Sequence, residues 1–442
     1  MWRRLAVLAL TACGDPPEAP SDGPRTCEGS GAACTSVAAC RSGVTTCDGC
    51  AAAEPIAGAC GAGGTCRDGL CTATSEQGLA NPIAGAGAFG AAVAADGRIV
   101  VGAPGDERAH VVEPGETGFA VAQTLASEFG AAGTLFGAAV AIAGDLAAVG
   151  APRSTGTGAP NDAAGAVIIF ERDPAANTWL ETAQILGPDG GGFGGAVALS
   201  GTRLVVGADR AGDGAVYVYD RASPTVWTPS ARIPAEPGAR RFGHAVALQG
   251  ERLVVGSLLD AGPRGAQGGA RVYDRGLDGW VLAATLRPAD PSGADTGDTQ
   301  FGAAVATAGD AVLVGAPGYA NGRGAAYLFE RGTGAWELAA DVYGPAVPAA
   351  GSAFGRGVHL ERNRAVISHA DGGTGITYVL RREAGGGWIT VGLVRDDAAA
   401  PGVDVGGVEV NARLGVSGST AILGYPGRSG GGVLAAHDLS GM

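Results

Sequence analysis

The side chains of this chain that could do chemistry are nine cysteines, five histidines and the carboxylates of its polar segments. No two histidines have the His-x-x-x-His spacing that binds a metal from one element. Glycine runs such as residues 190–192 precede a predicted strand rather than opening a helix, so they do not indicate a phosphate-binding loop. We therefore expect a protein that is not an enzyme and has no cofactor. A catalytic set assembled from separate loops, with carboxylates and histidines in one channel, is the alternative. The histidines are His110, His244, His359, His369 and His437.

The first thirteen residues have the pattern of an export signal that ends in a cysteine. Residues 1–4 are a short basic region, and residues 5–10 are an apolar stretch too short to span a bilayer. The sequence Leu10-Thr11-Ala12-Cys13 resembles the lipobox of bacterial lipoproteins, in which the leader is cut before the cysteine. An ordinary secretory signal followed by a coincidental cysteine is the alternative.

The lipobox resemblance implies where the protein would be found. Residues 1–12 would be a lipoprotein signal peptide, Cys13 would carry the lipid, and residues 13–26 would form a tether. Gly14, rather than an aspartate, follows the cysteine. By analogy with lipoprotein sorting, this favours the outer membrane. We therefore expect a lipid-anchored protein of the bacterial cell envelope, in contact with the membrane through its anchor only.

The other eight cysteines fall between residues 27 and 71, and none follows. An even number of cysteines in a short exported segment predicts a disulfide framework, because a segment this poor in large apolar residues needs covalent cross-links to fold. We predict a module over residues 27–71 with four disulfides, in a pairing that the spacing does not select. These cysteines are Cys27, Cys34, Cys40, Cys47, Cys50, Cys60, Cys66 and Cys71.

The pair Cys47-Asp48-Gly49-Cys50 has two other interpretations, half of a zinc site or a redox pair. A zinc site would need a second Cys or His pair at matching spacing, and the oxidising compartment argues against free thiolates. We therefore interpret these two cysteines as structural.

The net charge of −13 argues against nucleic acid as a partner.

The elements that position every other side chain belong to a repeat. Seven times, at intervals of 47 to 59 residues, the chain has Phe-Gly, an alternating apolar stretch, a glycine turn and Gly-Ala-Pro or a variant of it. Each unit continues with a third apolar strand and a fourth strand that opens with an aromatic residue. Four short strands per unit, repeated radially, predict the blades of a β-propeller. The units begin at Phe89, Phe136, Phe193, Phe242, Phe301, Phe354 and, degenerately, Val410.

Phe-Gly followed by Gly-Ala-Pro resembles the FG-GAP repeats of integrin α chains and of many bacterial surface proteins. The resemblance implies an all-β, seven-bladed propeller over residues 72–442, preceded by the disulfide-rich module and the lipoprotein signal peptide. The last unit lacks a fourth strand, and residues 72–82 have no other assignment. We expect this segment to pair into the last blade and to close the ring, since closure removes an exposed edge.

Many FG-GAP units bind calcium through an Asp-x-Asp-x-Asp-Gly-x-x-Asp loop between the first two strands. Here that place holds short turns such as Gly144-Asp145 and Gly309-Asp310. Six or more oxygen ligands cannot come from a two-residue turn with one carboxylate. We therefore expect no calcium at these positions. Glu171-Arg172, Asp220-Arg221 and their counterparts recur after the third strand, and we interpret these acid–arginine pairs as structural.

The longer, irregular loops join strand two to strand three, or strand four to the next blade, and in an up-and-down blade both kinds emerge on one face. Variable loops on a rigid scaffold are where binding residues concentrate. We expect a non-catalytic module that binds or adheres to a protein or a glycan through this face. An envelope hydrolase or lyase and a purely structural envelope protein are the alternatives. The candidate residues are Arg153, Asp162, Asp209, Arg210, Arg240, Asp260, Arg264, Asp295 and Asp298.

Overall fold

The structure is a computed structural model of the 442-residue chain. Almost all of its described elements are β-strands, as predicted for an all-β protein. No helix in the described part is long and apolar enough to cross a membrane. The structure describes the strands between residues 33 and 80, residue 82, and residues 87–115, 118–127, 133–154, 164–188, 191–262, 265–288, 298–344, 353–371, 374–383, 385–396, 414–417, 420–425 and 433–439.

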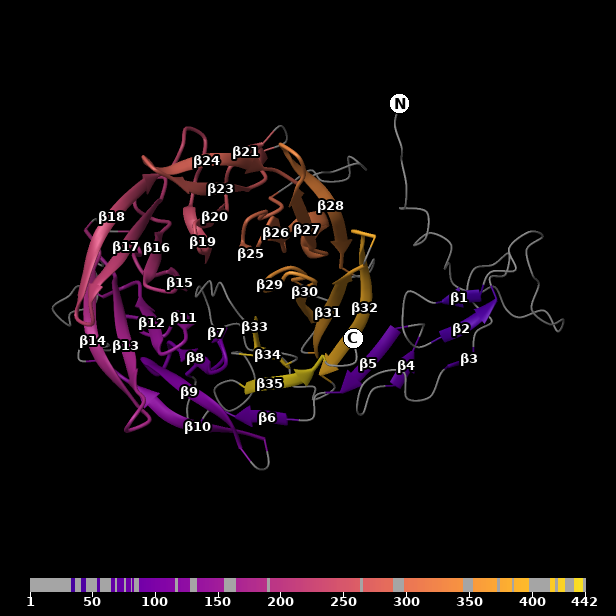
Figure 1. The fold of residues 1–442 in the computed structure, drawn as a ribbon, viewed down its shortest axis with the longest axis horizontal. Coiled ribbons are helices and arrows are strands. Elements are labelled where there is room, and N and C mark those ends of the chain that lie inside the picture. Colours follow the sequence, from indigo (N-terminus) through magenta and orange to yellow (C-terminus); the bar gives the residue numbers. More distant parts are fainter. Residues whose placement is uncertain are drawn as a thin grey trace.

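The sheets are arranged radially, with the first strand of each repeat innermost and the fourth strand outermost (Figure 1). Neighbouring strands within a repeat are antiparallel, because tight turns connect them. Blade 1 comprises β7 (Ala92–Ala95), β8 (Ile99–Ala103), β9 (Arg108–Gly115) and β10 (Gly118–Leu125); blade 2 comprises β11 (Ala139–Ala143), β12 (Leu146–Ala151), β13 (Ala166–Asp173) and β14 (Thr178–Leu186); blade 3 comprises β15 (Ala196–Ser200), β16 (Arg203–Ala208), β17 (Ala215–Ser223) and β18 (Val226–Pro234).

Two more blades follow in sequence, and the last blade uses a strand from near the N-terminus. A short helical turn, α1 (Tyr319–Gly322), lies between the second and third strands of blade 5. Blade 4 comprises β19 (Phe242–Gln249), β20 (Arg252–Ser257), β23 (Gly269–Gly276) and β24 (Gly279–Leu286); blade 5 comprises β25 (Ala304–Ala308), β26 (Ala311–Ala316), β27 (Ala325–Arg331) and β28 (Trp336–Tyr343); the closing blade comprises β33 (Leu414–Ser417), β34 (Thr420–Tyr425), β35 (Val433–Asp438) and β6 (Gln77–Ala80).

The prediction of seven blades behind a separate disulfide module is wrong. The chain has six four-stranded blades, and the repeat that begins at Phe354 builds a six-stranded sheet instead. Its extra strands come from the segment predicted to be the cysteine module, and no disulfide module is evident in the described part of that segment. The sheet has the order β29 (Val358–Leu360), β30 (Arg364–Asp371), β31 (Thr374–Arg382), β32 (Trp388–Asp396), β5 (Leu70–Thr74) and β4 (Thr65–Arg67).

The physical reason for the error lies at the outer edge of β32. A free edge offers unpaired N–H and C=O groups, and a nearby chain segment can pair with them without any covalent cross-link. Here β5 pairs in parallel with β32, and Cys71 stands opposite Gly392. Strand counting assigned one strand to the N-terminal segment, whereas it contributes strands to two neighbouring sheets. A small sheet of β1 (Ala33–Thr35), β2 (Arg41–Val44) and β3 (Glu54–Pro55) lies apart from the ring (Figure 1).

The predicted ring closure is confirmed for part of the expected segment. Strand β6 pairs antiparallel with β35, so residues 77–80 form the outer strand of the closing blade. The inner edge closes as well, because Gly424 of the closing blade lies against the backbone of Gly90 in blade 1. The two ends of the repeat array therefore meet in one ring.

The repeated Phe-Gly and Gly-Ala-Pro motifs are explained by the contact between neighbouring blades. The glycine after phenylalanine, Gly243 in blade 4, has a φ of 88°, which a residue with a Cβ adopts only under strain. Its carbonyl oxygen lies so close to Gly207 of blade 3 that a Cβ on Gly207 would collide with it. The phenylalanine, Phe242, is fully buried and meets Tyr273 edge to face, with ring centroids 6.3 Å apart.

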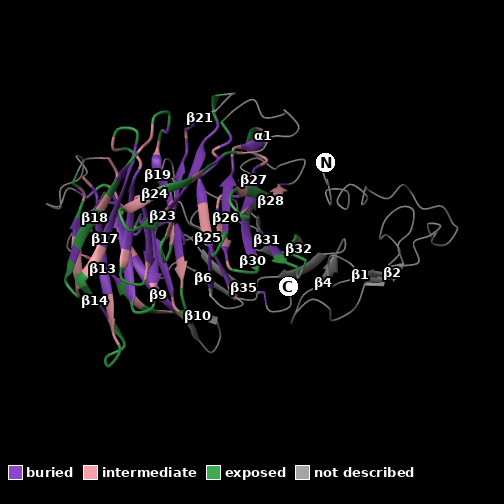
Figure 2. Ribbon diagram, turned by 45° about the horizontal axis from the view of Figure 1, so that its top comes forward, coloured by how far each residue is buried: buried purple, intermediate pink, exposed green. Residues whose placement is uncertain are grey.

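Each fourth strand from β10 to β32 also carries a β-bulge, seen as a register shift against the third strand. In blade 3, the hydroxyl of Ser230 at the bulge donates to the carbonyl oxygen of Val218 at 3.3 Å. A bulge twists an outer strand and disrupts its pairing, which protects an exposed edge from aggregation. Figure 2 shows buried residues along the interior strands and exposed ones at the turns and outer strands.

Candidate binding face

The loops lie on two opposite faces of the ring, as the topology predicts. On one face, the turn after each third strand bonds to the turn between strands one and two. The N–H of Arg275, for example, donates to the carbonyl oxygen of Glu251 at 2.8 Å. On the other face, each loop between strands two and three bonds to the preceding inter-blade loop, as Leu259 N–H does to Arg240 at 3.2 Å. We call these the turn face and the loop face.

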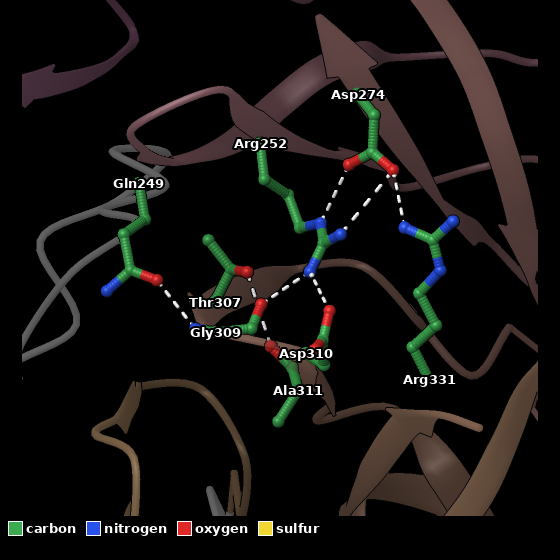
Figure 3. Close-up of polar contacts among 8 residues, drawn as sticks. All are labelled: Gln249, Arg252, Asp274, Thr307, Gly309, Asp310, Ala311 and Arg331. Atoms are coloured by element: carbon green, nitrogen blue, oxygen red, sulfur yellow. Dashed lines mark hydrogen bonds and ion pairs between the residues drawn. The ribbon is translucent and has the colours of Figure 1, made fainter. Parts of the chain in front are cut away.

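Charges on the turn face are paired between blades in a repeating pattern. Arg252 of blade 4 binds Asp274 of its own blade at 2.8 Å and Asp310 of blade 5 at 3.1 Å (Figure 3). Arg331 of blade 5 reaches back to Asp274 at 2.8 Å. The guanidinium of Arg252 also lies 5.0 Å from the ring centroid of Trp336. The turn face therefore uses its charges to hold blades together.

The recurring acid–arginine pairs belong to this network, as the structural interpretation requires. From blade 3 onward, an arginine at the end of the third strand binds the acid at the same place in the preceding repeat. Although partial burial alone would raise it, the hydrogen bonds from Arg252 and Arg331 hold the pKa of Asp274 below its usual range. The pairs are Arg221 with Glu171, Arg275 with Asp220, Arg331 with Asp274 and Arg382 with Glu330.

Some of the predicted loop-face residues lie at the surface of the structure, and others lie in its interior. Arg153, Arg210, Arg240 and Asp298 are exposed, as expected for side chains available to a ligand. Asp260 is fully buried, and the side chain of Asp209 is 12% exposed, so these two candidate carboxylates are not presented at the surface of the binding face. Asp162, Arg264 and Asp295 lie outside the described residues.

Only three of the nine cysteines lie in the part of the chain that the structure describes. Cys34, Cys66 and Cys71 lie in β1, β4 and β5, of which the backbone is described. In the β4–β5 hairpin, Cys66 and Cys71 are opposite each other in the register. The remaining cysteines, including Cys13, lie outside the described residues.

Asp209 is the centre of a polar cluster between blades 3 and 4. Its Oδ2 atom lies 2.6 Å from the Nη2 of Arg241 and 3.0 Å from the Nδ1 of His244, and Arg210 lies 4.0 Å from its Oδ1. Although burial alone would raise it, the hydrogen bonds from His244 and Arg241 hold the pKa of Asp209 below its usual range. We call Asp209, Arg210, Arg241 and His244 the Asp209 cluster.

Asp260 is the centre of a second cluster in blade 4. Its Oδ2 atom lies 2.9 Å from Arg271, which is 2% exposed, and 3.3 Å from Arg287. Arg271 also binds Glu236 at 3.2 Å. A buried carboxylate of this kind is tolerated because it is paired and hydrogen-bonded. We call Asp260, Glu236, Arg271 and Arg287 the Asp260 cluster.

A small hairpin of β21 (Ala261–Gly262) and β22 (Gly265–Ala266) stands on the Asp260 cluster. The N–H of Gly268 donates to the carbonyl oxygen of Asp260 at 3.1 Å, which closes the base of the hairpin. Figure 2 shows β21 projecting beyond the blades. The buried ion pairs thus anchor a loop that stands out on this face.

Sequence reasoning missed Arg241, His244, Arg271, Arg287 and Glu236, although departures from the repeat mark several of the sites. Asp209 stands where Gly-Ala-Pro has its proline, and His244 stands where the units that begin at Phe89, Phe136, Phe193 and Phe301 have alanine or glycine after Phe-Gly. Arg271 takes the strand position that is tyrosine in blades 3 and 5. Three departures from the repeat therefore meet at the boundary of blades 3 and 4.

A fourth departure, His110, lies inside blade 1 and away from this boundary. It is fully buried, packs edge to face on Phe89, and has its Nδ1 3.1 Å from the hydroxyl of Thr124. Burial lowers the pKa of His110 from 6.5 to about 4. The ring is therefore neutral at pH 7 and acts as a core residue.

The clusters offer arginine forks, a buried imidazole and carboxylates that are already paired. Among the described residues, no group of three or more His, Cys, Asp or Glu side chains could hold a metal ion. Arginine forks bind carboxylates and phosphates through parallel hydrogen bonds. The arginines of this face therefore supply groups that can recognise an anion through non-covalent contacts.

Comparisons with known proteins agree with the fold. The FG-GAP repeat family matches residues 120–170, 179–219 and 280–329. No curated protein sequence matches the chain.

Solved structures of similar fold come from varied proteins. A chain in a crystal structure of the mitotic checkpoint complex is 13% identical, with a TM-score of 0.50, and the match covers 83% of this chain and 95% of that one. Sqt1 of Saccharomyces cerevisiae is 11% identical, with a TM-score of 0.48, and covers 83% and 99%. The periplasmic gluconolactonase of Pseudomonas aeruginosa is 14% identical, with a TM-score of 0.48, and covers 76% and 93%. At 13% identity, the first of these shows a shared fold alone.

Proposed function

Because the chain belongs to the FG-GAP repeat family of β-propellers, we propose that it is a non-catalytic binding protein that holds a protein or glycan ligand on its loop face. One observation carries this proposal. Departures from the repeat meet on the loop face between blades 3 and 4, whereas the turn face keeps its charges in a regular inter-blade pattern. A scaffold needs only the regular pattern, so side chains that depart from it are candidates for recognition.

The construction of the loop face supports a binding role. The two clusters fix the inter-blade loop and the β21–β22 hairpin to strands β16 and β23 before any ligand arrives. Binding then requires little ordering of the backbone, which favours affinity. We propose further that a lipid on Cys13 holds this propeller at the bacterial cell envelope, because the leader has the lipobox pattern.

Paired substitutions on the two faces test the proposal. The purified chain is used to capture material from an envelope extract of the producing cell. Charge reversal on the loop face, at Arg210→Glu and Arg240→Glu, should abolish saturable capture without lowering the melting temperature, because exposed charges contribute little to folding. The matched control reverses two exposed turn-face charges, Arg362→Glu and Asp278→Arg, and should retain capture.

Two results would contradict the proposed function. Loss of capture in the turn-face control alone would place the site on the other face. Absence of saturable capture by the unsubstituted chain would favour a purely structural role.

A further inference from the structure

We infer that the loop face at the boundary of blades 3 and 4 recognises an anionic polysaccharide, through Arg210, Arg240 and Arg287. The inference rests on the proposed function, and it names the chemical class of the ligand. The chain as a whole carries a net charge of −13, so a positive surface on it requires a local cause. The local cause is that the two clusters bury most of their carboxylates and expose some of their arginines.

Two of the three carboxylates of the clusters face inward, whereas the third, Glu236, is partly exposed. Asp260 is fully buried, the side chain of Asp209 is 12% exposed, and that of Glu236 is 40% exposed. Each of them pairs with an arginine of its cluster, so their negative charge is largely neutralised before a ligand arrives. Among these three carboxylates, only Glu236 presents its charge to solvent, and that charge is paired with Arg271.

The arginines face outward in larger number. Five arginines meet four carboxylates in this area, because Arg240 and the exposed Asp213, whose carbonyl oxygen accepts from the N–H of Phe242 at 3.0 Å, join the members of the two clusters. The side chain of Arg210 is 51% exposed and that of Arg287 is 40% exposed, and Arg240 is exposed too. Arg240 contributes its backbone N–H to Asp260 at 3.3 Å, while none of the described side chains forms an ion pair with its guanidinium. Three exposed arginines therefore stand against two carboxylates that reach solvent, Glu236 and Asp213, and the balance of surface charge is positive.

Contacts within the clusters show that these arginines are neighbours. Arg240 and Arg287 both approach Asp260, at 3.3 Å each. Arg241, the next residue after Arg240, binds Asp209, which is also the partner of Arg210. The backbone of Arg240 and the guanidinium groups of Arg210 and Arg287 therefore lie in one region of the loop face. An array of arginines matches a polymer that repeats its negative charges.

The absence of apolar anchors favours a polysaccharide over a protein as that polymer. Protein interfaces have a core of buried aromatic and aliphatic side chains within a polar rim. The exposed large apolar residues of the described chain lie on fourth strands or in the turn before one, and none lies in either cluster. A polyuronate chain needs no apolar core, because its carboxylates supply the contacts. The residues in question are Leu180, Leu186, Val226, Leu277, Val281, Leu282 and Leu338.

The test measures binding of the full chain to polygalacturonate by biolayer interferometry. Neutral dextran, poly-glutamate and duplex DNA are the comparison polymers. We expect saturable binding to polygalacturonate, weaker binding to the other three, and loss of affinity as NaCl is raised, because salt screens exposed charges. Arg210→Gln, Arg240→Gln and Arg287→Gln should each weaken binding by about two- to fivefold, the range typical of one exposed charge pair. The triple variant should lose more than about tenfold.

Matched controls separate this inference from the proposed function. Arg362→Gln and Arg381→Gln, at exposed positions near the turn face, remove the same charge elsewhere and should leave polygalacturonate binding unchanged. Equal weakening by either control, or equal binding of dextran or poly-glutamate, would overturn the inference. No binding of polygalacturonate, together with envelope capture that still depends on the loop face, would refute the ligand class alone. If the unsubstituted chain captures no envelope material at all, the proposed function is refuted.

Discussion

Lowering the pH should destabilise this propeller through His110 before its carboxylates begin to titrate. The ring is fully buried, and its pKa is lowered from 6.5 to about 4. Above pH 6.5 the histidine is neutral in both the folded and the unfolded state and makes no pH-dependent contribution. Below pH 6.5 the unfolded chain binds a proton that the folded chain refuses, so the free energy of unfolding falls until about pH 4.

The size of this effect follows from the shift in pKa. At pH 5 the histidine of the unfolded chain is almost fully protonated, whereas that of the folded chain is not. The pH then lies about 1.5 units below the pKa of the unfolded chain, and the free energy of unfolding falls over this interval. At about 1.4 kcal/mol per unit, the free energy of unfolding should be lower by about 2 kcal/mol at pH 5 than at pH 7.5.

The matched variant is His110→Ile, since blade 2 has Ile168 at the equivalent strand position. The variant should lose this part of the pH dependence, because isoleucine has no proton to bind. Urea unfolding of both proteins at pH 7.5 and pH 5 measures the difference, and the NMR titration of the His110 ring measures the pKa directly. A pKa near 6.5, or an unchanged pH dependence in the variant, would refute the reasoning.

Three further predictions concern the blades and the anchor. Gly207→Ala should lower the free energy of unfolding by about 1–3 kcal/mol, because the new methyl group collides with the neighbouring blade, whereas Gly201→Ala meets open space and should cost about 1 kcal/mol through its positive φ; urea unfolding compares the two. A double-mutant cycle of Arg252→Ala and Asp274→Ala should give a coupling of about 1 kcal/mol that falls in high salt, and a coupling of zero would mean that the ion pair does not stabilise the ring. Cys13→Ser should move the protein from the membrane to the soluble fraction, and a variant that stays with the membrane would contradict the lipid anchor.

The repeat pattern was sufficient to predict how each blade is built. Phe242, Gly243 and Gly207 recur in fixed register because the contact between blades has room for only these side chains. The two-residue turns were predictable as well, and Gly201 and Gly250 have the positive φ that such hairpins require. Local backbone chemistry therefore gave the strands, the turns and the two faces.

The N-terminal segment could not be placed in this way. Its cysteines indicated cross-links, whereas β5 joins the open edge of β32 through backbone hydrogen bonds that depend on no particular side chain. Edge pairing of this kind leaves no pattern in a sequence. For that reason the count of seven equal blades failed at the repeat that begins at Phe354.

The candidate face was predictable, but the roles of its charges were not. Asp209 and Asp260 looked like surface carboxylates because they lie in long loops, yet both are covered by arginines from other parts of the chain. Arg241 and Arg271 reach them across 32 and 11 residues of sequence. Pairing over such separations depends on the fold. The usable signal was the departure of single residues from an otherwise regular repeat.

Hydrogen–deuterium exchange tests most directly the claim that the loop face is the binding site. The purified chain is measured alone and then with the material that it captures from the envelope. Protection should appear in residues 209–213, 238–244 and 258–268, which form the loops around the two clusters. The turns at residues 201–202, 250–251 and 309–310 should exchange at the same rate in both samples. Protection confined to those turns would contradict the account.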